Sequence, residues 1–236
     1  MNTLLLEDGD FSSSTSAIIR GQRADHLIET VGVKPGSVIR CGKVDGLMGE
    51  AVIREQSASE LSMDCSLQHK PPAASHIELI CALPRPKMLR RIVRTAAELG
   101  IKQLILINSF RVEKSYWQSP LLTPPKLREF CIEGLQQAGD TVLPNIILEK
   151  RFKPFVEDQL PSMIEGKQTI VAHPRAPALP ASKPRQACML AVGPEGGFID
   201  FEIEKLQSTG FSAHSFGQRV LRCDTAIPFL IATLGS

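Results

Sequence analysis

The chain has 236 residues, of which 43% are hydrophobic and 22% are charged, close to the averages of globular domains. This composition excludes a disordered chain, a collagen and a small disulfide-stabilised protein, and it allows one large domain or two smaller ones. The formal net charge is +2, but residues 71–155 alone carry 13 basic and 7 acidic groups, a net of +6. This asymmetry favours a polyanionic partner, with ordinary solvated helix faces as the alternative.

The sequence gives no sign of a membrane segment, a metal site or a disulfide. No apolar run reaches the roughly 18 residues that a membrane helix needs, and the opening leucines lack the basic flank of a signal peptide. The six cysteines have no metal-ligand spacing. We therefore expect a cytoplasmic protein without metal or membrane contacts.

Residues 1–70 have the pattern of a small β domain. Residues 37–41 and 50–54 are short β-branched segments, and the glycines at 46–49 supply a turn between them. The tandem prolines that follow Lys70 are typical of a linker. We expect one domain over 1–70 and a second over 71–236.

The second domain alternates between strand and helix patterns. Residues 77–83 and 103–107 are apolar runs typical of buried strands, and a helix is predicted between them over 86–99. This order predicts a parallel sheet with a right-handed crossover. The remaining elements are predicted as a helix over 124–138, strands at 145–149, 168–172 and 187–192, a helix over 201–208, a strand at 213–216 and a terminal helix from 225.

The predicted helix over 86–99 carries a basic face with no acid between residues 85 and 94. Its cations recur at i, i+3, i+4 and i+7, which places them on one side of the helix. Such a face suits RNA phosphates, while a solvated helix face is the alternative. The predicted RNA-binding residues here are Arg85, Lys87, Arg90, Arg91 and Arg94.

Two glycine-containing loops follow predicted strands. The segment 193–198 reads Gly-Pro-Glu-Gly-Gly-Phe, and its glycines let the backbone approach a ligand closely. Ligands in open α/β sheets bind beyond the carboxyl ends of strands, which is where this loop lies. The segment 216–226 carries two arginines before a helix that Asp224 or Thr225 can cap. A plain turn and a salt-bridged loop are the alternative interpretations.

Together the two loops resemble those of the 16S rRNA uracil-N3 methyltransferases, a family of SPOUT methyltransferases. The matching motifs are Gly-Pro-Glu-Gly-Gly-Phe at 193–198 and Gly-x-Arg-Val-Leu-Arg-x-Asp-Thr-Ala at 217–226. The resemblance continues in residues 23–27, 34–36, 82–87 and 97–100. It extends over essentially the whole chain.

The resemblance implies a PUA-like, RNA-binding β-barrel over 1–70 and an α/β SPOUT domain over 71–236 with a parallel sheet and a deep trefoil knot. It also implies a homodimer that binds S-adenosylmethionine and methylates ribosomal RNA, here 16S rRNA of the small subunit. In the first domain, Arg23 would contact RNA. The implied cofactor-binding residues are His173, Pro174, Gly193, Pro194, Glu195, Gly196, Gly197, Phe216, Gly217, Val220, Leu221 and Arg222.

Some positions depart from the family pattern. Phe216 replaces a leucine, Cys223-Asp224 replaces Thr-Glu, and Asp140 stands where the family has a basic residue. The departures leave the cofactor loops intact and leave the target nucleotide open.

Methyl transfer from a sulfonium is an in-line displacement that depends on alignment. Uracil N3 must lose its proton, so the site needs to stabilise an anionic base. We expect Arg222 to supply that cation and Glu195 or Asp224 to be the candidate general base, with turn bracing and helix capping as their alternative roles. The target base would be unstacked. A SPOUT enzyme acting on another RNA atom, such as a ribose 2′-oxygen, and a non-catalytic RNA-binding protein stay open as other functions.

Overall fold

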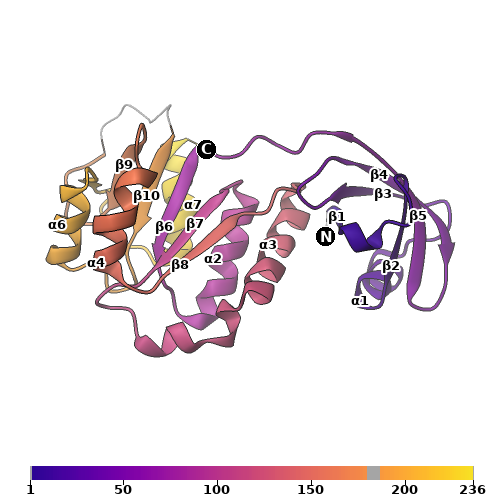
Figure 1. Ribbon diagram of the computed structural model, residues 1–236, viewed down its shortest axis with the longest axis horizontal. Coiled ribbons are helices and arrows are strands. Elements are labelled where there is room, and N and C mark those ends of the chain that lie inside the picture. Colours follow the sequence, from indigo (N-terminus) through magenta and orange to yellow (C-terminus); the bar gives the residue numbers. More distant parts are fainter. Residues whose placement is uncertain (1, 180–186, 236) are drawn as a thin grey trace. The chain divides into compact units, whose positions relative to one another are not determined.

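The computed structural model describes residues 2–179 and 187–235. They form two compact units, each built around a sheet of its own (Figure 1). The first unit consists of Met1–Ala73 and Ile132–Leu143, and the second of Ala74–Cys131 and Pro144–Ser236. No helix in the described residues is long and apolar enough to cross a membrane. In the same residues, no group of three His, Cys, Asp or Glu side chains is placed to hold a metal ion.

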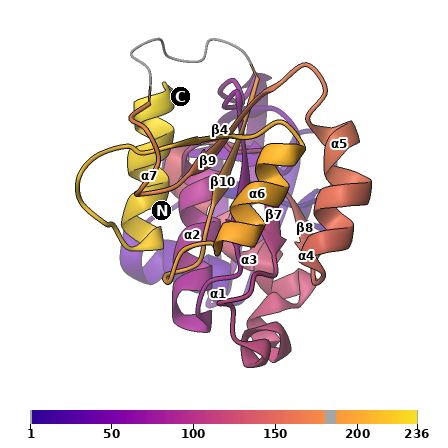
Figure 2. The same cartoon turned by 90° about the vertical axis from the view of Figure 1, so that its left-hand side faces the viewer.

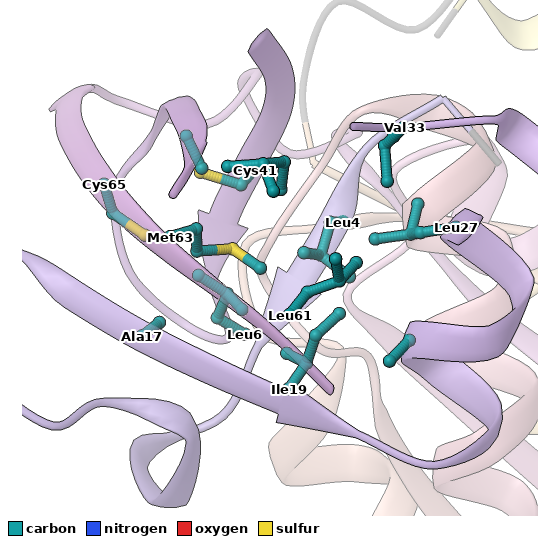
Figure 3. Packing of buried hydrophobic residues seen from close by; sticks show 13 residues of the cluster. Leu4, Leu6, Ala17, Ile19, Leu27, Val33, Cys41, Leu61, Met63 and Cys65 are labelled. Atoms are coloured by element: carbon teal, nitrogen blue, oxygen red, sulfur yellow. The ribbon is translucent and has the colours of Figure 1, made fainter. Parts of the chain in front are cut away.

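The first unit contains a five-stranded sheet in the order β1-β3-β4-β5-β2. Its strands are β1 (Leu4–Leu6), β2 (Ser16–Arg20), β3 (Val38–Lys43), β4 (Met48–Gln56) and β5 (Glu60–His69). The pair β1–β3 is parallel, and the other pairs are antiparallel. Alternate residues of β5, namely Leu61, Met63 and Cys65, point into the core with Leu4 and Ile19 (Figure 3). The short helix α1 (Gln22–Asp25) continues into a π-helical turn, η2 (His26–Val31).

Residues 132–143 complete the first unit from far along the chain. The Thr141 hydroxyl donates to the Gly46 carbonyl at 2.6 Å, and the Leu143 N–H donates to Asp45 at 2.8 Å. Asp140 is buried, and its Oδ1 accepts the N–H groups of Thr141 at 2.6 Å and Val142 at 3.0 Å. The acid that departs from the family pattern therefore organises this turn.

The second unit contains a six-stranded sheet in the order β11-β9-β10-β6-β7-β8. Its strands are β6 (Ile77–Ala82), β7 (Gln103–Ile107), β8 (Asn145–Glu149), β9 (Gln168–Ala172), β10 (Cys188–Val192) and β11 (Ser212–His214). Every pair is parallel, which confirms the parallel sheet predicted from the alternating pattern. The side chains of β10 are buried throughout, as expected of a strand covered on both faces.

Helices cover both faces of this sheet. The helices α2 and α7 pack together on one face, and α4, α5 and α6 lie on the other (Figure 2). Their bounds are α2 (Pro86–Glu98), α3 (Pro124–Ala138), α4 (Phe152–Pro154), η5 (Phe155–Gln159), α5 (Leu160–Met163), α6 (Asp200–Ser208) and α7 (Cys223–Leu234), with short 3-10 turns η3 (Lys114–Gln118) and η4 (Pro120–Leu122). The segment from α4 to α5 was not predicted from the sequence.

Candidate functional site

Three strands of the second unit end side by side at a cavity of about 520 Å³. The last residues of β9, β10 and β11 are in register, with Ala172 opposite both Val192 and His214. The loops that follow these strands and the first turns of α7 line the cavity. Its position fits the rule that ligands of open α/β sheets bind at the carboxyl ends of the strands.

The structure brings together almost all of the predicted cofactor-binding residues. The exception is Arg222, which is not among the residues that line the cavity. The predicted residues that do line it are His173, Pro174, Gly193, Pro194, Glu195, Gly196, Gly197, Phe216, Gly217, Val220 and Leu221.

The glycine turn after β10 is closely packed. The Gly197 N–H donates to the Pro194 carbonyl at 2.8 Å, and Gly197 has a φ of 74°, which favours glycine. A Cβ on Gly193 would lie 2.9 Å from the Phe198 nitrogen. A Cβ on Gly196 would lie 2.8 Å from Cδ of Arg111. A side chain at Gly193 would therefore clash with the backbone of the turn, and one at Gly196 would displace a side chain from another loop.

Arg111 is a residue of the site that sequence reasoning missed. It lies in the loop after β7, lines the cavity, and donates through Nη1 to the carbonyl oxygens of Gly196 and, at 3.4 Å, Gly197. No periodicity or motif marks it in the sequence. Only the carboxyl-end position of its loop could have drawn attention to it.

Glu195 lines the cavity and faces a cation of the predicted RNA-binding set. Its Oε1 lies 3.8 Å from Nε of Arg85, the residue that precedes α2. The two loops that these residues belong to are thus in electrostatic contact.

Arg222 and Asp224 lie at the start of α7. The Arg222 side chain is 82% exposed, and its Nε lies 4.0 Å from Oδ1 of Asp224. The Asp224 side chain is only 5% exposed, and its Oδ2 accepts from Nη1 of Arg91 at 2.6 Å. Asp224 therefore ties α7 to α2, and Arg222 projects toward solvent.

The cations on and beside α2 are neutralised in part by nearby acids. Besides the pairs of Arg85 and Arg91, Nη2 of Arg94 lies 3.5 Å from Glu98. Arg90 lies over the Phe130 ring at 5.9 Å, and Lys87 is exposed. Glu98 is on the same helix, whereas Glu195 and Asp224 belong to segments more than a hundred residues away and cannot be recognised from the local sequence.

Arg23 lies in the first unit and is bound by that unit's own groups. It donates to Asp10 at 2.9 Å and to the Leu5 carbonyl at 2.6 Å. These contacts join the region of α1 to β1.

Cys223 lines the cavity, and Cys81 is buried in β6. Burial raises the pKa of the Cys223 thiol to about 11, and Glu195 adds to the shift. Burial also raises the pKa of Cys81 well above its usual value. Neither thiol is a thiolate at neutral pH, so neither is suited to act as a nucleophile.

Comparison with known proteins identifies the family. The RNA methyltransferase domain family matches residues 71–235. The chain belongs to this family. A relative from Treponema pallidum named ribosomal RNA small subunit methyltransferase E is 28% identical over 232 residues, which cover 96% of this chain and 87% of the relative. The protein of the same name from Bacillus subtilis is 23% identical over 234 residues, covering 92% and 88%.

Solved structures share the fold. The ribosomal RNA small subunit methyltransferase E of Neisseria gonorrhoeae, bound to S-adenosylmethionine, superposes with a TM-score of 0.74 at 20% identity, covering 99% of this chain and 96% of that one. A Legionella pneumophila methyltransferase in complex with the same cofactor gives a TM-score of 0.76 at 19% identity, with the same coverage.

Proposed function

We propose that this RNA methyltransferase uses S-adenosylmethionine to methylate N3 of a uridine in 16S rRNA of the small ribosomal subunit. The observation that carries the proposal is the cavity at the ends of β9, β10 and β11, with its glycine turn. The names of the Treponema and Bacillus relatives support ribosomal RNA as the substrate. An rRNA substrate would place the activity in the cytoplasm.

The residues of the cavity fit S-adenosylmethionine. Its volume of about 520 Å³ falls in the range of small-molecule sites. Val220, Leu221 and Leu230 offer apolar walls for an aromatic base, and the glycine turn offers backbone to a polar ligand. When bound, S-adenosylmethionine supplies an electrophilic methyl group on a sulfonium.

The side chains around the cavity suggest roles in handling the uracil. Glu195 lines the cavity, so its carboxylate can accept the proton that leaves N3. Arg222 is exposed at the start of α7 and can turn toward an RNA base to stabilise the developing anion. Alignment of the base against the methyl donor would supply much of the rate enhancement.

The proposal also covers the architecture that the resemblance implies. The sheet of the first unit would form the PUA-like barrel expected over residues 1–70, and the second unit, which makes up most of residues 71–236, would hold the trefoil knot. Val220, Leu221 and Phe229 are exposed apolar residues around the cavity, and they support a homodimer with this surface at the interface.

The test is methylation of 16S rRNA from cells that lack the gene. Purified protein and isotopically labelled S-adenosylmethionine are added to small subunits and to free rRNA, and the digested RNA is analysed by mass spectrometry. We expect labelled N3-methyluridine at one position. Label on a ribose 2′-oxygen would support the alternative RNA target, and no label in any RNA would overturn an enzymatic function.

A further inference from the structure

The loop after β7 is joined to the glycine turn at two points. The first is Glu202 of α6, a carboxylate that is only 2% exposed. Its Oε1 accepts the N–H of Phe110 at 2.7 Å, and its Oε2 accepts the N–H of Ile199 at 3.0 Å. One buried side chain therefore fixes both the residue before Arg111 and the end of the glycine turn. Hydrogen bonds of this type, with a charged acceptor, are among the stronger ones.

The second point is Arg111 itself. Its guanidinium donates to the carbonyl oxygen of Gly196 and lies 3.4 Å from that of Gly197. Its Cδ covers Gly196 so closely that a Cβ there would lie 2.8 Å away. The side chain thus holds the turn through both its charge and its aliphatic stem.

These contacts fix the conformation of the turn. A peptide unit is planar, so holding the Gly196 carbonyl also fixes the direction of the Gly197 N–H, which closes the turn on Pro194 at 2.8 Å. The left-handed φ of Gly197 lies in the same peptide segment. Without Arg111, two carbonyls of the turn would lose their charged donor, and the turn would sample other conformations that glycine permits.

We propose that Arg111 is a positioning residue for the methyl-donor site: it holds the Gly193–Phe198 turn in the shape that binds the cofactor, and Glu202 anchors the loop that carries it. The inference rests on the proposed function in taking S-adenosylmethionine as the ligand of the cavity. It adds a residue from the loop after β7, which holds none of the cofactor-binding residues that the resemblance implies.

The first test needs no cofactor. Hydrogen exchange of the peptide that contains residues 193–198 is compared in the wild type, Arg111→Ala and a matched control, Arg151→Ala. Arg151 is also exposed in the second unit but lies before α4, away from the cavity lining. We expect at least tenfold faster exchange in the turn for Arg111→Ala alone. Exchange at the wild-type rate in a folded Arg111→Ala protein would overturn the proposal.

The second test measures binding and turnover. Arg111→Ala is expected to raise the Kd for S-adenosylmethionine, measured by calorimetry, and the KM for the cofactor by at least tenfold, with the KM for RNA unchanged. Arg111→Lys keeps the positive charge but loses the planar, forked guanidinium group. Its Kd for S-adenosylmethionine should therefore fall between those of Arg111→Ala and the wild type. A change confined to the KM for RNA would make Arg111 an RNA contact and overturn the proposal.

A melting curve for each variant separates positioning from general stability. If Arg111→Ala melts far below the wild type, Arg111→Lys is the variant that decides, because it keeps the stem that covers Gly196. Wild-type protein that binds the cofactor but leaves 16S rRNA unmodified would contradict the proposed function alone, because the exchange and binding tests of Arg111 would still stand.

Discussion

Single residues of the glycine turn differ in what a side chain would meet. At Gly193 a Cβ would meet the backbone nitrogen of Phe198, whereas at Gly196 it would meet the flexible side chain of Arg111. The first contact cannot be relieved without moving the turn, and the second can be relieved by displacing Arg111. Substitution at Gly196 therefore tests ligand binding more cleanly than substitution at Gly193.

We predict that Gly196→Val weakens S-adenosylmethionine binding at least tenfold, about 1.4 kcal/mol, while the protein stays folded. The physical reason is that the new side chain displaces Arg111 and fills part of the turn's open face. Calorimetry gives the affinity, and circular dichroism checks the fold. Gly9→Val is the control, because a Cβ there meets nothing within 4 Å and φ is not positive. Wild-type affinity in folded Gly196→Val would remove the turn from the cofactor site.

Arg222 allows a prediction that separates chemistry from structure. Arg222→Ala should cut single-turnover methyl transfer by at least tenfold and change cofactor affinity much less, because the side chain lies outside the cavity lining. Its ion pair with Asp224 is long, at 4.0 Å, and the arginine is exposed, so little stability should be lost. A large drop in Tm together with weaker cofactor binding would instead assign Arg222 a structural role.

At the scale of elements, the cations on the basic face of α2 differ in their contacts. Arg91 pairs with the buried carboxylate of Asp224, Arg90 lies over the Phe130 ring, and Lys87 is exposed on the helix. A substitution on this face should therefore affect either the packing of α2 against α7 or the binding of RNA, depending on the residue.

We predict that Arg91→Ala lowers the free energy of unfolding by about 1 to 3 kcal/mol, because it removes the hydrogen-bonded cation from a buried carboxylate. The double variant Lys87→Ala, Arg90→Ala should change stability less and reduce the salt dependence of RNA binding, by about one unit of slope per lost phosphate contact at most. Chemical denaturation and RNA titrations at several salt concentrations measure both. An unchanged salt slope in the double variant would mean that this face is only solvated.

The sequence was informative where a signal is local. Apolar runs and proline starts predicted β6, α2, β7 and α3 because strands and helices have fixed periods and caps. It was uninformative where partners are distant. The ion pair of Arg91 with Asp224 and the contact of Arg111 with Gly196 join residues 133 and 85 positions apart, and nothing in a local window encodes them. The candidate cavity could be predicted from its loops, but not the side chains from other loops that hold them.

Contacts between distant residues also decide which residues belong to each of the two units. The first unit uses residues 132–143, which include the end of α3, a helix that begins in the second unit. Thr141 fills a space over Gly42, where a Cβ would lie 2.5 Å from its Cγ2. A boundary drawn only from the prolines after Lys70 misses this returning segment, because its role comes from tertiary contacts.

The whole molecule should lose stability in alkali because burial makes several of its cysteines resist ionisation. Every cysteine is free and buried. Burial raises the pKa of Cys188 and Cys223 to about 11 and that of Cys131 to about 12, from an ordinary value of 9.0. Between pH 9.0 and about pH 11 to 12, these thiols release their protons in the unfolded chain but keep them in the folded chain. The free energy of unfolding therefore falls as pH rises through this range.

Cys188 gives the simplest test, because burial alone raises its pKa. The contribution of the protonated Cys188 thiol to the free energy of unfolding is fully present below pH 9.0 and is lost by about pH 11. A shift of about 2 units corresponds to roughly 3 kcal/mol. We predict that the wild type loses about that much more stability than Cys188→Ala between pH 8 and pH 11, as measured by urea denaturation across this range. Lysine and tyrosine titration affects both proteins equally and cancels in the comparison. Parallel pH profiles for the two proteins would show that the Cys188 thiol ionises as readily in the folded protein as in the unfolded chain.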